Sequence, residues 1–115
     1  MKVVRGAINI PANTKEEIQK GTQELFNAVL QEARIKPHQI NYLIVSSTPD
    51  ITAFYPCAAI RNLGYDTLPM LCVQEMDVEG SLPLTIRFLL TAHGKNRRFF
   101  CYLRDTSRLR REKSL

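Results

Sequence analysis

The chain has 115 residues, of which 44% are hydrophobic and 23% are charged, and it carries a formal net charge of +5. This length has room for one domain with a sizeable core, and the composition is that of ordinary globular proteins, so a disordered chain is disfavoured. No apolar run approaches the roughly 20 residues that span a bilayer, and no signal-peptide pattern opens the chain, so we expect a cytoplasmic protein without membrane partners.

The first half of the chain is predicted to form a strand, a long helix and a second strand. Residues 2–10 have the composition of a strand. Thr14 and Glu17 form a capping-box pattern, and the apolar residues that follow recur at helical spacing to about Arg34. Residues 40–46 form a nearly continuous apolar run that is typical of a buried strand.

The second half repeats this alternation. A short helix is predicted over residues 56–63, because a proline opens it and a glycine follows it. Residues 68–73 are predicted as a third strand, residues 81–93 as a helix ended by Gly94, and residues 98–104 as a fourth strand rich in aromatic residues. Strands that alternate with helices predict an α/β or α+β layer domain.

Metal and nucleotide cofactors are not expected. The three cysteines, Cys57, Cys72 and Cys101, are odd in number and lack Cys-x-x-Cys spacing, which argues against a disulfide framework. Neither His38 nor His93 lies at ligand spacing from a cysteine, so a zinc site is not expected. The chain also lacks the glycine-rich motifs that bind nucleotide phosphates.

Basic residues gather at the end of the chain, where five of the last twelve residues are arginine or lysine. The rest of the chain is nearly balanced in charge, so a nucleic-acid-binding face over the whole domain is not expected. The basic end alone keeps an RNA-binding module open, which would show steep salt dependence. We predict a folded domain over residues 1–104 and a mobile basic tail over residues 105–115.

Polar residues set in apolar segments mark a candidate small-molecule pocket. Cys72 and Glu75 lie three residues apart, and Arg87 follows within an apolar stretch. A guanidinium there either snorkels to the surface, which is its usual fate, or binds a partner. Arg5 precedes Gly6, a small residue that lets a ligand approach the strand closely, although an exposed strand position explains it equally well.

Two further patterns have ordinary explanations. Glu75 and Asp77 would point the same way in an extended segment, as paired catalytic carboxylates do, but the cationic neighbours would hold both ionised. Tyr55 and Tyr102 are typical of packed rings whose hydroxyl groups lie at the edge of the core.

Four separated segments, taken together, carry a resemblance to a known family. They are Val4–Ala7, Ser47–Asp50 with Tyr55 and Arg61, Cys72–Val78 with Arg87, and Tyr102–Leu103. In this order and spacing they resemble the monofunctional trimeric chorismate mutases of the Bacillus type, and the resemblance extends from about Val3 to Leu103.

The resemblance implies an α+β single domain with helices packed on one mixed β-sheet, the chorismate mutase/RidA-like class, which assembles as a pseudo-barrel homotrimer. It also implies the Claisen rearrangement of chorismate to prephenate in phenylalanine and tyrosine biosynthesis. This unimolecular reaction needs no proton transfer, covalent intermediate or cofactor. It can be accelerated by restraining the substrate and by placing a cation at the ether oxygen, a role that suits the permanent charge of arginine.

The resemblance assigns roles to particular residues. Arg87 would face the ether oxygen and Arg5 would hold a substrate carboxylate. Glu75, helped by Cys72, would orient the ring hydroxyl, and Tyr102 would reach the side-chain carboxylate.

The other substrate-binding residues that we expect are Tyr55, Cys57 and Arg61 from the adjoining subunit, Leu71, and the tail residue Arg110. Arg108 or Arg111 would replace Arg110 if the register of the tail slips. The chain departs from the family pattern, since it has Tyr55 in place of phenylalanine and Cys57-Ala58 in place of Ala-Lys. One peripheral positive charge is therefore missing.

Three rival classes stay open at this point. A RidA-like trimer, whether a binding protein or an imine deaminase, would also hold a carboxylate with an arginine. A chorismate-binding protein without catalysis would keep Arg5 and have no need of Arg87. An RNA-binding module would use the basic tail.

Overall fold

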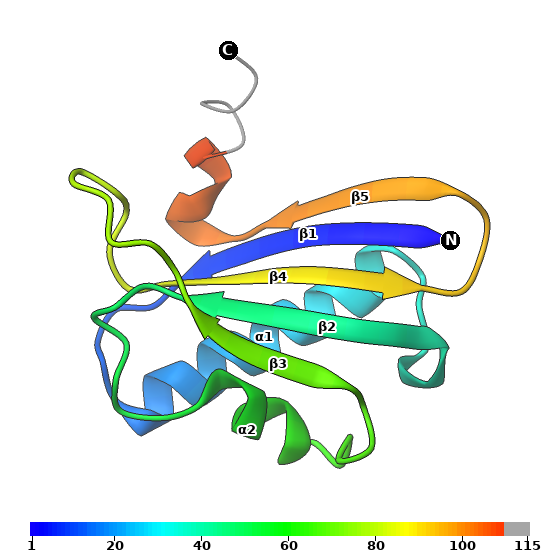
Figure 1. Ribbon diagram of the computed structural model, residues 1–115, viewed down its shortest axis with the longest axis horizontal. Coiled ribbons are helices and arrows are strands. Elements are labelled where there is room, and N and C mark those ends of the chain that lie inside the picture. Colours follow the sequence, from blue (N-terminus) through cyan, green and yellow to red (C-terminus); the bar gives the residue numbers. More distant parts are fainter. Residues whose placement is uncertain (110–115) are drawn as a thin grey trace.

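The computed structural model describes residues 1–109, which form a five-stranded mixed sheet with two helices packed on one of its faces (Figure 1). The elements in chain order are β1 (Lys2–Asn9), α1 (Lys15–Glu32), a 3-10 turn η1 (Pro37–Gln39), β2 (Ile40–Ser47), α2 (Pro56–Arg61), β3 (Met70–Gln74), β4 (Thr85–Ala92), β5 (Arg97–Tyr102) and a second 3-10 turn η2 (Arg104–Thr106). The α+β single-domain fold with one mixed sheet is thus confirmed. No helix in residues 1–109 is long and apolar enough to cross a membrane.

The strand order is β3-β2-β4-β1-β5, so β4 is the central strand. It runs antiparallel to both neighbours, β1 and β2, whereas the outer pairs β1–β5 and β2–β3 are parallel. Each parallel pair is joined through other elements, and the α1 and α2 crossovers both lie on the same face of the sheet (Figure 1).

The helix predicted over residues 81–93 is wrong, because residues 85–92 form strand β4. The buried residues Ile86, Phe88, Leu90 and Ala92 alternate with Thr85, Arg87, Leu89 and Thr91, but the apolar Leu89 interrupts the polar set and creates the apolar run of residues 88–90. A short apolar run of this kind fits a buried strand as well as a buried helix. The β-branched residues Thr85, Ile86 and Thr91 favour the strand, and Gly94 lies in the turn to β5 with a φ of 141°.

The core lies between the sheet and the apolar side of α1. The Thr14 hydroxyl accepts a hydrogen bond from the Glu17 amide at 3.2 Å, so the helix begins where the capping pattern predicts. Leu25 and Val29 of α1 are fully buried, and each such side chain contributes about 1.5 to 3 kcal/mol of hydrophobic stabilisation. A Cβ added at Gly6 would lie 3.3 Å from both of these side chains, which shows how closely α1 approaches β1.

The opposite face of the sheet, here called the open face, is covered by neither α1 nor α2 (Figure 1). Side chains that alternate away from the helices stand on it, among them Leu71, Val73 and Leu89, which are 58%, 39% and 38% exposed. The first part of the tail packs beside it, because Thr106 is fully buried and its hydroxyl donates to the Ala7 carbonyl at 3.0 Å.

Candidate active site

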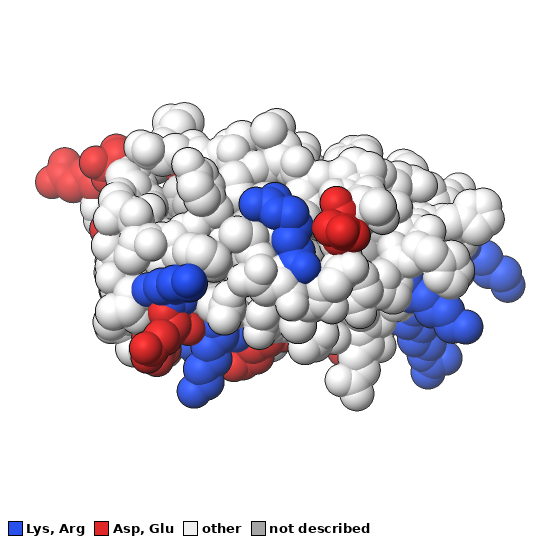
Figure 2. Space-filling view, turned by 90° about the horizontal axis from the view of Figure 1, so that it is seen from below, with Lys and Arg blue, Asp and Glu red and all other residues white. Residues whose placement is uncertain are grey.

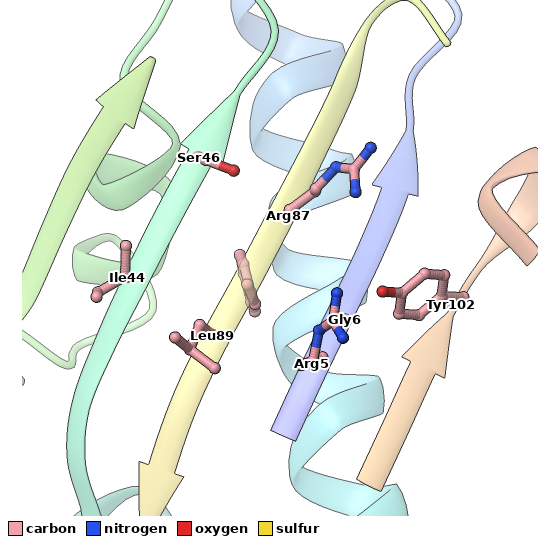
Figure 3. A pocket seen from close by; sticks show the side chains of 8 residues that line it. Arg5, Gly6, Ile44, Ser46, Arg87, Leu89 and Tyr102 are labelled. Atoms are coloured by element: carbon pink, nitrogen blue, oxygen red, sulfur yellow. The ribbon is translucent and has the colours of Figure 1, made fainter. Parts of the chain in front are cut away.

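A hollow of about 200 Å³ on the open face brings together residues from four strands. Arg87 extends from β4, Arg5 from β1, Tyr102 from β5 and Ser46 from β2 (Figure 3). The strand register explains this convergence, because Arg87 pairs with Ala7 on one side and with Ser46 on the other. The lining contains two arginines and no carboxylate, so it suits an anionic ligand.

Glu75 forms an ion pair with Arg87 at the edge of this hollow. The Arg87 Nε atom lies 2.7 Å from Glu75 Oε1, and the two side chains are 26% and 22% exposed. The contact is close but poorly aligned, because the buried Nε–H has no hydrogen-bond acceptor among residues 1–109. Of the two interpretations left open for Arg87, the structure therefore supports a charged partner and leaves the guanidinium free to meet a ligand.

Glu75 is itself held by β2. The Ser46 hydroxyl donates to Glu75 Oε1 at 2.8 Å, and the Glu75 amide donates to the Ser47 carbonyl at 2.9 Å. Both polar contacts of the carboxylate use Oε1, so Oε2 has no hydrogen bond within the described residues. A carboxylate held in this way can orient Arg87 and still accept a hydrogen bond from a ligand.

Arg5 and Tyr102 flank the other side of the hollow. Arg5 is exposed, and Tyr102 is half-buried on the neighbouring strand β5. Figure 3 shows the Tyr102 hydroxyl directed toward the strand that carries Arg5. The hydroxyl and the guanidinium can therefore donate to the same acidic ligand.

Cys72 lies on the other face of the sheet, away from Glu75. Its sulfur is 2.7 Å from the Cys57 sulfur and accepts a hydrogen bond from the Cys57 amide at 3.4 Å. The structure thus brings Cys72 together with the start of α2 and separates it from Glu75, which contacts Arg87 on the open face.

A second hollow, of about 570 Å³, opens beside this cysteine pair. Cys72 and Tyr55 both line it, and Tyr55 is 72% exposed. Arg61 is exposed at the end of α2, and Leu71 is exposed on the open face of β3. Within one chain these residues do not converge on the hollow that holds Arg87. Arg110 and Arg111 lie outside the described residues.

The surroundings of the two thiols separate their pKa values. The hydrogen bond between the two thiols lowers the pKa of Cys72 to about 7. The Cys57 amide and the positive charge of Arg61 also lower the pKa of Cys72, whereas burial raises it. The same hydrogen bond, together with burial, raises the pKa of Cys57. Burial also raises the pKa of Cys101, which lies on β5.

Two features of the site do not follow from the sequence patterns above. Those patterns identify Ser46 only as part of a strand, although alternation along β2 places it opposite the buried Leu43 and Val45. The Cys57–Cys72 pair has no sequence signal, because its members lie 15 residues apart on different elements. No cluster of metal-binding side chains is present in the part of the chain that the structure describes.

The comparison with known proteins identifies the class to which this site belongs. The sequence profile described as chorismate mutase type I matches residues 1–113. The chain therefore belongs to the type I chorismate mutase family, and the resemblance drawn from four segments is confirmed.

Individual relatives agree with this assignment. The chain is 38% identical to chorismate mutase AroH of Bacillus subtilis (strain 168) over 89 residues, which are 76% of this chain and 70% of the relative. It is 35% identical to chorismate mutase AroH of Thermus thermophilus over 111 residues, which are 93% and 91% of the two chains. Among solved structures, a chorismate mutase from Clostridium thermocellum superposes with a TM-score of 0.83 at 27% identity, covering 91% of this chain and 96% of that one.

Proposed function

We propose that the protein rearranges chorismate to prephenate in a cleft built around Arg87. The observation that carries this proposal is the pairing of Arg87 with Glu75 at the edge of a hollow that Arg5 and Tyr102 also line, in a chain of this family. The site offers fixed charges and hydrogen-bond donors, which is what a pericyclic rearrangement requires.

Arg87 stabilises the transition state in this proposal. As the bond between carbon and the ether oxygen of chorismate lengthens, negative charge develops on that oxygen. A donor that is already oriented in a partly dry site is worth about 3 to 4 kcal/mol of barrier lowering. Glu75 supplies the orientation, since it contacts Nε and leaves the outer nitrogens of the guanidinium to face the ligand.

The remaining residues of the open-face hollow hold the substrate in its reactive conformation. Arg5 binds one carboxylate bidentately, and Tyr102 donates to the carboxylate of the enolpyruvyl side chain. Glu75 accepts a hydrogen bond from the ring hydroxyl through Oε2, because Arg87 and Ser46 both contact the other oxygen, Oε1. Restricting the flexible side chain in this way removes part of the entropic barrier.

We further propose that the protein works as a homotrimer in which each site is shared by two subunits. The apolar side chains Leu71, Val73 and Leu89 are exposed on the open face, and exposed apolar groups of this kind mark association surfaces. The adjoining edge of the molecule, seen from the side of α2 and β3, carries a few charged side chains among mostly uncharged residues (Figure 2). Association of copies through the open face would bury these apolar side chains.

The separation of the site residues within one chain also supports a shared site. The set of Tyr55, Cys57, Arg61 and Cys72 lies on the helix side of the sheet, and the Arg87 set lies on the open face. We therefore assign Cys72 to the wall that the adjoining subunit contributes, together with Arg61, and not beside Glu75 of its own chain. The cytoplasmic location expected from the sequence stays a prediction.

A spectrophotometric assay of chorismate disappearance tests the function. The purified protein should consume chorismate without added metal or nucleotide, and equally fast in the presence of a chelator. The same assay separates the enzyme from a RidA-like protein, a non-catalytic chorismate-binding protein and an RNA-binding module. A rate no higher than the uncatalysed rearrangement at micromolar protein would overturn the proposal.

A further inference from the structure

The rearrangement proposed above uses no thiol chemistry, yet two cysteines face each other between α2 and β3. The sulfur atoms of Cys57 and Cys72 lie 2.7 Å apart, about 0.7 Å more than the roughly 2.05 Å of a disulfide bond. Both cysteines are free thiols in the structure. Only a small movement of either side chain separates this contact from a covalent bond.

The two thiols are chemically unequal. The sulfur–sulfur contact alone does not decide which thiol holds the proton, but Cys72 also accepts the Cys57 amide N–H at 3.4 Å and feels the positive charge of Arg61. These interactions stabilise a thiolate on Cys72 and leave the proton on Cys57. A thiolate beside a protonated thiol is the arrangement of a reactive cysteine and its resolving partner.

Access also distinguishes the three cysteines. Cys72 is half-buried and lines the hollow of about 570 Å³ beside Tyr55, so a small solute can reach its sulfur. Cys57 is 4% exposed and lies behind it, and Cys101 is 7% exposed on β5. An oxidant therefore meets Cys72 first, and Cys101 serves as an internal control.

We propose that Cys57 and Cys72 are a redox-active dithiol, which a peroxide converts into an intrachain disulfide linking α2 to β3. The Cys72 thiolate attacks one oxygen of hydrogen peroxide, the O–O bond breaks, and a sulfenic acid forms while hydroxide leaves and takes up a proton as water. The Cys57 sulfur then attacks the Cys72 sulfur, the S–O bond breaks, and the hydroxyl leaves with the Cys57 proton as a second water. Two thiols and one peroxide thus give one disulfide and two waters.

The effect on turnover rests on the proposed function, because both cysteines belong to the wall that we assign to the substrate cleft. A disulfide would remove the thiolate from this wall and draw the start of α2 toward β3. We expect oxidised protein to lose most of its chorismate turnover and to regain it when a dithiol reductant reopens the bond.

Thiol mapping of the full chain tests the dithiol without using activity. After brief treatment with one equivalent of hydrogen peroxide, alkylation and mass spectrometry should find free thiols reduced from three to one, with Cys57 and Cys72 in one linked peptide and Cys101 alkylated. Cys101→Ala should form the same link, whereas Cys57→Ala should leave Cys72 as a sulfenic acid that dimedone captures. Three free thiols after oxidation, or a link that involves Cys101, would overturn the proposal.

The peptide map of the unaltered chain is decisive even if Cys57→Ala fails to fold. The measurement of turnover is a separate test from the peptide map. A disulfide that forms without changing turnover would show that oxidation does not affect the active site, while the proposal of a redox-active dithiol would remain supported. Protein that is inactive in both redox states would contradict the proposed function, while the peptide map still decides on the dithiol.

Discussion

Glu75 and Arg87 form their ion pair across an intervening strand. Glu75 follows β3 and Arg87 lies on β4, and β2 runs between them in the sheet. Ser46 of β2 fills the gap, since its hydroxyl donates to the same carboxylate oxygen that contacts Arg87 Nε. The position of the guanidinium is thus set by three strands rather than by one flexible side chain.

Arg87→Ala should lower kcat by roughly a hundred- to a thousand-fold while changing the dissociation constant of chorismate much less, because the lost interaction is strongest in the transition state. Arg87→Lys should recover little of this loss, since a point charge cannot replace the planar fork. Steady-state kinetics and equilibrium binding measure the two effects. The exposed Arg97→Ala is the matched control, and turnover of Arg87→Ala within a few-fold of the parent would exclude the assigned role.

Ser46→Ala should lower kcat/KM by about five-fold, because one hydrogen bond worth about 1 kcal/mol to the orientation of Glu75 is lost. Ser46→Thr keeps the hydroxyl on a β-branched side chain that suits a strand, and it should retain most of the activity. Ser47→Ala is the control, because Ser47 contacts Glu75 only through its backbone carbonyl. Equal kinetics for the two alanine variants would show that Ser46 does not position Glu75.

The reactivity of Cys72 should rise with pH through about 7. Its pKa is lowered to about 7 from the ordinary 9.0 by the Cys57 hydrogen bonds and by Arg61, so the thiolate forms at a lower pH than in a free cysteine. The rate of alkylation by iodoacetamide, followed at Cys72 by peptide mass spectrometry, should increase several-fold between pH 6 and pH 8. Arg61→Ala should move the midpoint upward. A midpoint near that of a free cysteine in the parent protein would contradict this assignment.

Mixing two inactive variants should restore activity if sites are shared between subunits. Arg61→Ala damages the helix-side wall and Arg87→Ala the open face, so a trimer that contains both variants includes some clefts with two intact halves. Partial turnover should return after the subunits exchange, which differently tagged proteins can verify. Exchanged trimers that stay inactive would indicate a site built from a single chain.

Removing residues 110–115 should raise KM more than it lowers kcat, because the arginines of this segment would add attraction for a dianionic substrate. The truncation begins after the described residues, since cutting before Thr106 would also remove its hydrogen bond to Ala7 and expose part of the core. Michaelis constants at low and high salt measure the effect. Unchanged kinetics at low salt would remove Arg110 from the proposed site.

Local sequence signals predict most of the fold where a single residue type controls the backbone. The capping pattern at Thr14 indicates the start of α1, and Pro56 with Gly64 indicates α2. Strand β4 is predicted as a helix because its apolar run of residues 88–90 fits either structure, and the pairing with β1 and β2 on its two sides, which decides for a strand, is a property of the assembled sheet.

The residues of the proposed site are predicted individually only through the resemblance, and strand geometry bears on one of them. Cys72 and Glu75 lie three residues apart, and an odd separation along an extended segment places two side chains on opposite faces. The structure follows this rule. The contact between Cys72 and Cys57 depends on how α2 packs on β3, which no local pattern encodes.

The buried Thr106 fixes the start of the tail close to the strand position of Arg87. Its hydroxyl bonds to the carbonyl of Ala7, the residue that pairs with Arg87 in the sheet register. Arg110 follows only four residues later, and an extended chain of that length reaches at most about 14 Å. If the tail arginines bind the substrate as proposed, their local concentration at the site would be set by this short covalent link and would be independent of the concentration of the protein.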